Sequence, residues 1–576
     1  MKKLLSMLLV LSMVVCLFAA CGSQPAAETS AESAASVSSE ETAEASEAEA
    51  PAEEAASEAE ASSESSEEAG YSPSANVPIA FPLFDEPVKL TYMGEGSPWN
   101  MAGDVVWSQA LQTIDEMANV EWEQTWLTMS TGTDTFNLTI ASGDYPDVIS
   151  NFYKYYSNGI DDGIDQEIII DMDEPIHEYM PNYLSIVESD PEILKMASTD
   201  DGRIWGVHLI SNPVQDSFNG PIARTDLMDK YGIDSMETLD DWENYLTQCL
   251  QNEAECARGP LLLQSTGFMS NFTTPSFTIS SAFDSGTVDT PWIVIDGQVI
   301  YSPMTDGYKD YLNLMADWYQ KGLVYQDFAS YAPAFGQASM LSTGEITLSD
   351  GFYNSFDDTE ADATVEGLTV DAMPYPVQNA GDTIHLRNYT YQVRPEYTMI
   401  ISTACDYVEE VCKYFDYMWT DEGIRLVNYG PEGITWNWGD DGEIEFTDVI
   451  TNDPDGNTVK SMFTYYGTFN FCTYNDWTRE TITLSDKCMN ALELWASCGD
   501  KNYVLPNVTL STEEAEIYGS NFSDVNTHAQ EMTLKFITGQ ADIDAEWDSY
   551  VASLETMGVQ KVIDCYQAAY ERYEAR

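Results

Sequence analysis

The feature that most limits the possible folds is an alternation of strand and helix patterns over residues 88–150. Apolar strand patterns are separated by amphipathic helix patterns: strands are expected at Val88–Tyr92, Val120–Leu127 and Asp147–Ser150, and helices at Val105–Met117 and Thr133–Ala141. Consecutive strands that are joined through helices run parallel, and the helices then cover the faces of the sheet. The sequence therefore predicts an α/β fold built on a parallel sheet.

Loops at the carboxyl ends of these strands are the expected positions of ligand-binding residues, because ligands of open parallel sheets bind beyond that edge. The segments Met93–Gly103 and Asn151–Gly159 follow the first and third predicted strands. Their side chains are therefore the first candidates for a binding site.

Later helix patterns each carry one apolar, aromatic-rich face, and short strand patterns separate them. The helices are expected at Thr238–Asn252, Thr305–Lys321 and Tyr407–Trp419, and the strands at Arg203–Leu209, Pro291–Ile295, Glu345–Leu348 and Met399–Ser402. Such aromatic stripes are typical of core packing, so we assign them to the core rather than to a ligand site. Residues 71–576 exceed what one compact core normally spans, and two or more lobes are expected.

The N-terminus has the layout of a secretory signal peptide over residues 1–20. Two lysines precede the apolar stretch Leu4–Leu17, and small residues stand just before Cys21. The stretch LFAAC also resembles the lipobox of bacterial lipoproteins, which implies a lipid on Cys21 and a membrane anchor. An ordinary signal peptide with an incidental cysteine is the alternative.

The segment that follows, residues 21–70, is expected to be a disordered tether. Between Gly22 and Gly70 it holds fourteen glutamates, no lysine or arginine and no aromatic residue. Such a sequence cannot bury enough apolar surface to offset the entropy of ordering, and its charges repel one another. The tether would hold a folded part near the membrane without touching it.

The overall charge excludes some partners. The chain has 97 acidic and 23 basic residues and a formal net charge of −74. A surface this acidic repels phosphate backbones, so nucleic-acid binding is not expected, and a strongly anionic ligand would need a local basic pocket. The eight cysteines of residues 71–576 form no C-x-x-C pair, which favours buried free thiols, with disulfides between distant segments as the alternative.

Common catalytic motifs are absent from the sequence. There is no G-x-S-x-G, no H-E-x-x-H, no phosphate-binding loop and no dinucleotide fingerprint, and the four histidines are scattered. No metal, cofactor or catalytic residue is therefore expected. A surface glycoside hydrolase remains a rival, because its chemistry requires only two suitably spaced carboxylates.

Several segments, in order along the chain, resemble the extracellular solute-binding proteins of bacterial ABC importers, family 1. They are ASGDYPDVI (Ala141–Ile149), DGRIWGV (Asp201–Val207), IARTDLMDKYGI (Ile222–Ile233), the threonine-capped helix start Glu237–Trp242, WTDEGIRLVNYGPEG (Trp419–Gly433) and DPDG (Asp453–Gly456). The resemblance covers about Val88 to Gly456. The last hundred residues match nothing specific.

The resemblance implies a two-lobed, periplasmic-binding-protein-like fold of type II, with a hinge and an interlobe cleft. By analogy, residues 82–210 and 397–432 form lobe 1, and residues 211–396 and 433–576 form lobe 2. It also implies a monomer that delivers a small solute, expected to be a neutral oligosaccharide, to the permease subunits of an ABC transporter. The expected location is the extracellular face of the membrane.

Ligand contacts are predicted on loops that follow strands or carry glycines. The candidates after strands are Glu95, Trp99, Asn151 and Tyr153, and those in a glycine-rich loop are Trp436 and Trp438. The resemblance further implies Asp350, Phe352 and Tyr353, because the segment LSDGFYNSF is similar to a ligand platform of the family. Trp436 is the leading candidate, because it alternates with polar residues in a glycine-rich loop. Each aromatic residue has a core role as its alternative. A peptide-binding or sensory lipoprotein would share the fold and the anchor, so it is the closest alternative function.

Overall fold

The computed structural model describes residues 74–97, 107–128, 131–211, 216–263, 274–330 and 336–576, all within one compact unit, Gly70–Arg576. The predicted signal peptide (1–20), the tether (21–70), Cys21 and Trp99 lie outside the described residues. No helix among the described ranges is both long enough and apolar enough to cross a membrane.

A six-stranded mixed sheet forms the centre of the first lobe, in the order β13-β4-β10-β3-β1-β2. Its strands are β1 (Val88–Glu95), β2 (Val120–Leu127), β3 (Val148–Ser150), β4 (Val207–Ser211), β10 (Val393–Ile401) and β13 (Tyr474–Asn475). β1 runs parallel to both β2 and β3, which confirms the predicted parallel arrangement of the first three strands. β10 is antiparallel to β3 and β4, so the whole sheet is mixed rather than parallel.

The helices of the first lobe cover this sheet. They are α2 (Gln109–Ala118), α3 (Gly132–Ser142), α4 (Phe152–Tyr155), α5 (Ile160–Asp165), α6 (Asp173–Tyr179), α7 (Pro181–Val187), α8 (Pro191–Ala197), α15 (Val408–Tyr417) and α16 (Asp421–Tyr429). The first of them, α2, begins later than the predicted Val105, because the Ser108 hydroxyl caps it by accepting a hydrogen bond from the Leu111 amide. Its apolar face, with Leu111 and Ile114, is buried in the first lobe's core.

The second lobe has its own core and a three-stranded antiparallel sheet, β8-β5-β9. These strands are β8 (Leu348–Phe352), β5 (Asn219–Arg224) and β9 (Val370–Ala372), and β6 (Trp292–Ile295) forms a hairpin with β7 (Gln298–Tyr301). The α-helices packed around them are α9 (Thr225–Tyr231), α10 (Leu239–Asn252), α11 (Pro275–Ser280), α12 (Asp306–Gln320), α13 (Gly336–Thr343), α14 (Phe356–Ala361) and α20 (Asp486–Ser497). Single 3-10 turns lie at Ala254–Cys256, Ser281–Phe283, Ser302–Met304 and Phe328–Ser330.

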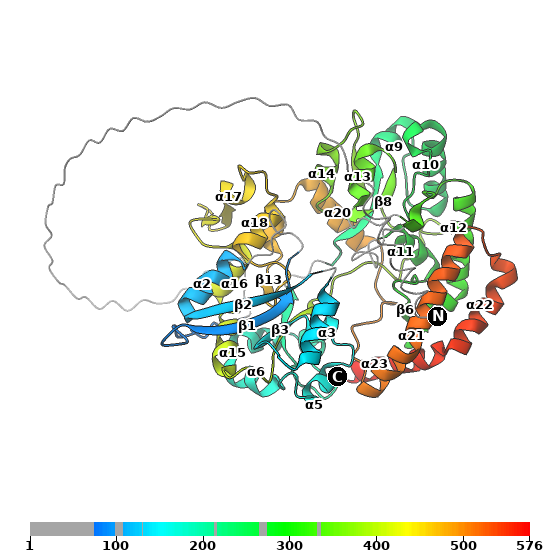
Figure 1. The fold of residues 1–576 in the computed structure, drawn as a ribbon. Coiled ribbons are helices and arrows are strands. Elements are labelled where there is room, and N and C mark those ends of the chain that lie inside the picture. Colours follow the sequence, from blue (N-terminus) through cyan, green and yellow to red (C-terminus); the bar gives the residue numbers. More distant parts are fainter. Residues whose placement is uncertain (1–73, 98–106, 129–130, 212–215, 264–273, 331–335) are drawn as a thin grey trace, which may run out of the picture. The chain divides into compact units, whose positions relative to one another are not determined.

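Three long helices complete the second lobe, although the sequence of this region resembles nothing specific. They are α21 (Thr512–Ile537), α22 (Ile543–Met557) and α23 (Val559–Ala575). Figure 1 shows α21 beside α12, with α23 against α21. Phe536, Trp547 and Leu554 are buried in the core of the second lobe. These helices therefore belong to the folded lobe and are not a separate extension.

A small cluster of elements lies between residues 436 and 481. It contains the hairpin of β11 (Trp436–Trp438) and β12 (Ile444–Phe446), and the helices α17 (Asp448–Thr451), α18 (Val459–Tyr466) and α19 (Thr478–Thr481). Helix α18 has a minor core of its own with Ile450, Met462 and Phe463. It packs against α2 and α16 of the first lobe.

One predicted lobe assignment needs correction in this region. The analogy places all of residues 433–576 in lobe 2, but β13 pairs with β4 in the six-stranded sheet, and Cys472 is buried in the core of the first lobe. The physical reason is that β4 would otherwise have an unpaired outer edge. β13 pairs with this edge at Ile210 and Ser211 and so provides hydrogen-bond partners for the backbone of β4.

The described cysteines are all free thiols, and seven of the eight are buried. The predicted thiol state is thus confirmed for these residues. None of them forms a disulfide between segments.

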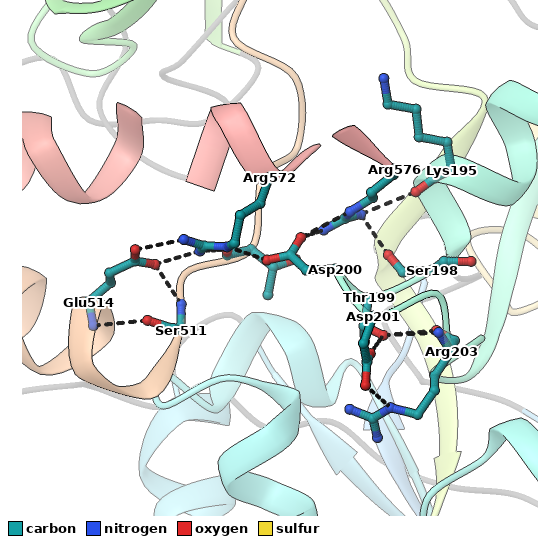
Figure 2. A network of polar contacts seen from close by, with 11 residues as sticks. Lys195, Ser198, Thr199, Asp200, Asp201, Arg203, Ser511, Glu514, Arg572 and Arg576 are labelled. Carbon is teal, nitrogen blue, oxygen red and sulfur yellow. Dashed lines mark hydrogen bonds and ion pairs between the residues drawn. The ribbon is translucent and has the colours of Figure 1, made fainter. Parts of the chain in front are cut away.

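An arginine clamp, defined as Arg572 and Arg576 with their shared partner Asp200, joins α23 to the first lobe (Figure 2). Arg572 Nε donates to Asp200 Oδ2 at 2.5 Å, and its terminal nitrogens donate to the Glu514 carboxylate at 2.8 and 2.6 Å. Arg576 Nε donates to Asp200 Oδ1 at 3.0 Å, and Nη1 donates to the Ser198 carbonyl at 2.6 Å. The clamp therefore ties the second lobe's helices to the segment between α8 and β4.

Candidate functional site

A hollow of about 680 Å³ is the candidate site. On one side it is lined by β8 and its following loop and by α13, α14 and α20 of the second lobe. On the other side it is lined by the start of α18, which packs on the first lobe. Figure 1 shows α13, α14 and α20 around β8, and α18 beside α2 and α16. The hollow therefore lies between the second lobe and α18 of the small cluster, which itself packs on the first lobe.

Asp350, a predicted site residue, lines the hollow from β8. Its side chain is buried, and its Oδ2 accepts a hydrogen bond of 2.5 Å from the Thr278 hydroxyl. Its Oδ1 is buried and has no hydrogen-bond partner among the described residues. Burial raises the pKa of Asp350 to about 7, because removal from water penalises the charged form.

Glu480 lines the hollow from α19 and was not predicted. Its Oε2 accepts a hydrogen bond from the hydroxyl of Tyr353, whereas its buried Oε1 lacks a partner in the described part of the chain. Burial raises the pKa of Glu480 to about 8. The hollow thus contains two carboxyl groups that hold protons near neutral pH.

Aromatic rings flank these carboxyl groups. Phe352 lies at the end of β8 and stacks on Phe218, with ring centroids 5.8 Å apart and planes 7° from parallel. Tyr353 is buried and makes an edge contact with Trp477 at 5.4 Å. Three predicted residues, Asp350, Phe352 and Tyr353, therefore come together in the hollow.

One cation, Lys460 of α18, also lines the hollow. Its Nζ lies 4.9 Å from the ring centroid of Phe469, and the guanidinium of Arg479 lies 5.2 Å from the same ring. Burial, and then the positive charges of Arg479 and Arg394, lower the pKa of Lys460 to about 7. Lys460 therefore carries less than a full positive charge at neutral pH.

Glu95, Asn151 and Tyr153, the predicted first-lobe residues that the structure describes, do not line this hollow. Asn151 is only 2% exposed. Its side-chain Oδ1 accepts a hydrogen bond from the backbone N–H of Glu95 at 2.9 Å, and its Nδ2 donates to the backbone carbonyl of Glu396 at 2.7 Å. The side chain therefore links the end of β1 to β10. Glu95 pairs with Lys154 at 2.7 Å and borders a second, smaller hollow of about 40 Å³. Tyr153 packs on Trp205 with ring centroids 5.6 Å apart.

Trp436 does not line the hollow, contrary to its prediction as the leading ligand contact. Only 2% of it is exposed, its Nε1 donates to the Gly430 carbonyl at 2.9 Å, and its ring packs against Tyr429. The alternation around it belongs to the short strand β11, in which Trp436 is buried while Asn437 and Trp438 are exposed. Trp438 is 51% exposed and makes an edge contact with Trp436, but it also lies outside the hollow.

Sequence reasoning missed the hollow's contribution from α18 and α19. Lys460 lies in the first turn of α18, two residues after Thr458, which caps that helix. The DPDG segment ends just before this cap, so the resemblance did include a segment close to Lys460 in the sequence. Glu480 lies in the short stretch TRET, which has no periodic pattern, and no sequence signal marks it.

Two proteins of described identity are similar to the chain in sequence. Fructooligosaccharide ABC transporter substrate-binding protein FusA of Streptococcus pneumoniae serotype 4 is 22% identical over 541 residues, which are 86% of this chain and 92% of FusA. Lipoprotein LipO of Bacillus subtilis is 25% identical over 227 residues, which are 38% of this chain and 42% of LipO. No protein-family model matches the chain.

Solved structures share the fold at low sequence identity. Alginate-binding protein AlgQ2 superposes with a TM-score of 0.67 at 20% identity, covering 85% of this chain and 99% of AlgQ2. An HMO-binding, ABC-transporter-associated solute-binding protein from Bifidobacterium longum infantis gives a TM-score of 0.68 at 15% identity, covering 85% of this chain and 99% of that protein.

FusA, AlgQ2 and the Bifidobacterium protein are all described as binding proteins. The predicted two-lobed α/β fold is confirmed by the structural matches. Over 86% of its length the chain is therefore similar to a substrate-binding protein of an ABC transporter, the kind of protein that its sequence motifs resemble.

Proposed function

We propose that this protein binds an oligosaccharide in the hollow between β8 and α18 and presents it to the permease subunits of an ABC transporter. The observation that carries this proposal is the hollow itself, which combines the ring of Phe352 with the carboxyl groups of Asp350 and Glu480. An aromatic face suits the C–H surface of a sugar, and carboxyl oxygens suit its hydroxyls. The relatives' described ligands, fructooligosaccharide, HMO and alginate, support a saccharide.

Lobe closure would carry the signal to the transporter. A ligand held between β8 of the second lobe and α18, which packs on the first lobe, contacts both lobes fully only in a closed arrangement. It then favours that arrangement by its differential contact energy. The transporter can distinguish loaded from empty protein by this difference in shape, and a monomer suffices for the mechanism.

Calorimetry against a ligand panel tests the binding proposal. The panel contains the neutral oligosaccharides kestose, maltotriose and lacto-N-tetraose, with triglycine to represent peptides. We expect the wild-type protein to bind at least one of the oligosaccharides and not triglycine. Binding of triglycine alone would favour a peptide carrier, and release of reducing sugar during the titration would indicate a hydrolase.

A pair of aromatic variants locates the site in the same experiment. Phe352→Ala removes a ring that lines the hollow, and we expect about 5- to 150-fold weaker binding, by analogy with the loss of other stacking faces. Trp438→Ala removes a half-exposed ring outside the hollow and serves as the matched control. Equal losses in the two variants would place the ligand elsewhere.

We also propose that a lipid on Cys21 anchors the protein at the extracellular face of the membrane, with residues 21–70 as the tether. The lipobox-like stretch before Cys21 and the relative LipO, which is described as a lipoprotein, support this location. Cys21→Ser should move the protein from the membrane fraction to the medium while its ligand affinity stays unchanged. Equal membrane retention of the variant would refute the anchor.

A further inference from the structure

The hollow contains two carboxyl groups whose hydrogen bonding is incomplete. Asp350 uses one oxygen for the Thr278 hydroxyl, and Glu480 uses one oxygen for the Tyr353 hydroxyl. The second oxygen of each group, Oδ1 and Oε1, is buried without a partner among the residues that the structure describes. Buried polar atoms are normally hydrogen-bonded, so these two oxygens indicate that a polar ligand completes the site.

We infer that Asp350 and Glu480 are specificity-determining residues of the hollow, which hydrogen-bond the hydroxyls of uncharged saccharides and disfavour saccharides that carry carboxylates. This inference rests on the proposed function and names the saccharide class that the same site takes. A hydroxyl donates and accepts, so it satisfies a carboxyl group in either protonation state. A ligand carboxylate only accepts, so it can pair with Asp350 or Glu480 only while that group holds its proton, and it adds a negative charge to a hollow lined by further acidic side chains.

The charged groups around the pair reinforce this selection. Asp357 and Asp358 of α14 also line the hollow, so four acidic side chains face one lysine, Lys460. Arg479 lies behind Lys460 and is buried, with its Nη1 donating to the Thr468 carbonyl at 2.9 Å. Burial, and then the positive charges of Arg479 and Arg394, lower the pKa of Lys460 to about 7, which weakens this cation as a partner for a ligand carboxylate.

The pH dependence follows from the same groups. The carboxyl groups of Asp350 and Glu480, with pKa values raised by burial to about 7 and about 8, lose their protons as the pH rises through this range. Lys460 loses its proton over the same interval. The hollow therefore becomes more negative on alkalinisation, and discrimination against an anionic saccharide should increase.

Amide variants test the inference, because Asn and Gln retain the size and hydrogen-bonding capacity of a protonated carboxyl group without the charge. Calorimetry measures the affinity for two ligands, trigalacturonate and the neutral oligosaccharide of the panel above that binds most tightly. The measurements are made at pH about 6 and about 8.5 on wild type, Asp350→Asn, Glu480→Gln and the double variant. Asp289→Asn is the control, because its carboxyl group is also raised in pKa by burial, to about 6, but does not line the hollow.

We expect the wild-type protein to favour the neutral ligand at least tenfold at pH 8.5, and more than at pH 6. Each single variant should bind the neutral ligand about two- to tenfold more weakly, the effect of one altered hydrogen bond. The double variant should bring the two ligands closer in affinity and remove most of the pH dependence, while Asp289→Asn behaves as wild type.

The outcomes separate the two proposals. If wild type binds no saccharide, the proposed function and the inference both fail. If wild type binds a neutral saccharide but the amide variants leave the selectivity and its pH dependence unchanged, only the inference fails. Tighter binding of trigalacturonate that disappears in Lys460→Gln would also overturn the inference, because the lysine would then be the receptor of an anionic ligand.

Discussion

At the scale of single residues, burial raises the pKa of Asp115 in the first lobe to about 7. Its carboxyl accepts hydrogen bonds from the Tyr414 hydroxyl at 2.6 Å and Trp107 Nε1 at 2.8 Å. Because the folded-state pKa exceeds the unfolded value of 3.8, the stability that this group contributes is fully present below pH about 4. It is lost as the pH rises through about 7.

Replacement of Asp115 by Asn removes this titration. The unfolding free energies of Asp115→Asn and wild type are measured by urea denaturation. We expect the value of the variant minus that of wild type to rise steadily between pH about 4 and about 8, because only wild type loses the contribution of the protonated carboxyl group. The exposed carboxylate of Asp134 on α3 provides a control, since Asp134→Asn should show no such trend. A difference between wild type and Asp115→Asn that is independent of pH would refute the assigned shift.

Trp436 should behave as a core residue. Its ring is buried in the small cluster and its Nε1 is hydrogen-bonded to the Gly430 carbonyl. Trp436→Ala should lower the unfolding free energy by about 3–5 kcal/mol, as large aromatic truncations in cores do, and should change ligand affinity little in protein that remains folded. Melting curves and calorimetry on one preparation check both parts. A specific affinity loss with an unchanged melting temperature would restore Trp436 as a ligand contact.

The residues of the candidate site were only partly predictable from the sequence. Asp350 and Phe352 were proposed because the segment LSDGFYNSF resembles a ligand platform of the solute-binding family, and the structure places both residues at the end of β8. Trp436 was placed outside the core because its alternation with polar residues fits both an exposed loop and a short strand in which a single tryptophan is buried. Glu480 could not be found, because only tertiary folding brings α19 beside β8.

At the scale of elements, periodic segments were predicted well and short ones were not. β1 begins at Val88 and β2 spans Val120–Leu127, as expected. Each strand has eight residues, which is enough for its alternation of apolar residues to be recognised in the sequence. β13 contains only two residues, which is too short for a strand pattern in the sequence. It forms because its backbone pairs with the edge of β4. This one strand moves part of the predicted second lobe into the first lobe's sheet.

The capping box of α10 gives a prediction at this scale. The Thr238 hydroxyl accepts from the Asp241 amide at 3.2 Å, and the Asp241 carboxylate accepts from the Thr238 amide at 2.9 Å. Thr238→Ala should lower the unfolding free energy by about 1 kcal/mol, whereas Thr238→Ser, which keeps the acceptor, should cost little. Equal destabilisation by the two substitutions in urea denaturation would mean that the hydroxyl does not act as a cap.

At the scale of the whole molecule, the arginine clamp links the lobes outside the hollow (Figure 2). The side chain of Arg576 is only 6% exposed, so loss of its partner leaves a nearly buried charge. Asp200→Asn should lower the unfolding free energy by about 1–3 kcal/mol and broaden the distribution of distances between spin labels placed on the two lobes.

The neighbouring residue offers a matched control for the clamp. Asp201 accepts hydrogen bonds from Thr199 at 2.5 Å and from Arg203 at 2.8 Å, all within the first lobe (Figure 2). Asp201→Asn should therefore leave the interlobe distances unchanged. If the two variants gave the same distance distribution, the clamp would have no role in fixing the lobes.

The most direct test of the central claim is a crystal structure of the protein with the tightest neutral oligosaccharide of the panel. The account predicts a sugar in the hollow between β8 and α18, one ring against Phe352, and hydroxyls about 3 Å from Asp350 Oδ1 and Glu480 Oε1. A saccharide bound elsewhere, for example on the exposed face of Trp438, with this hollow holding only water, would contradict it.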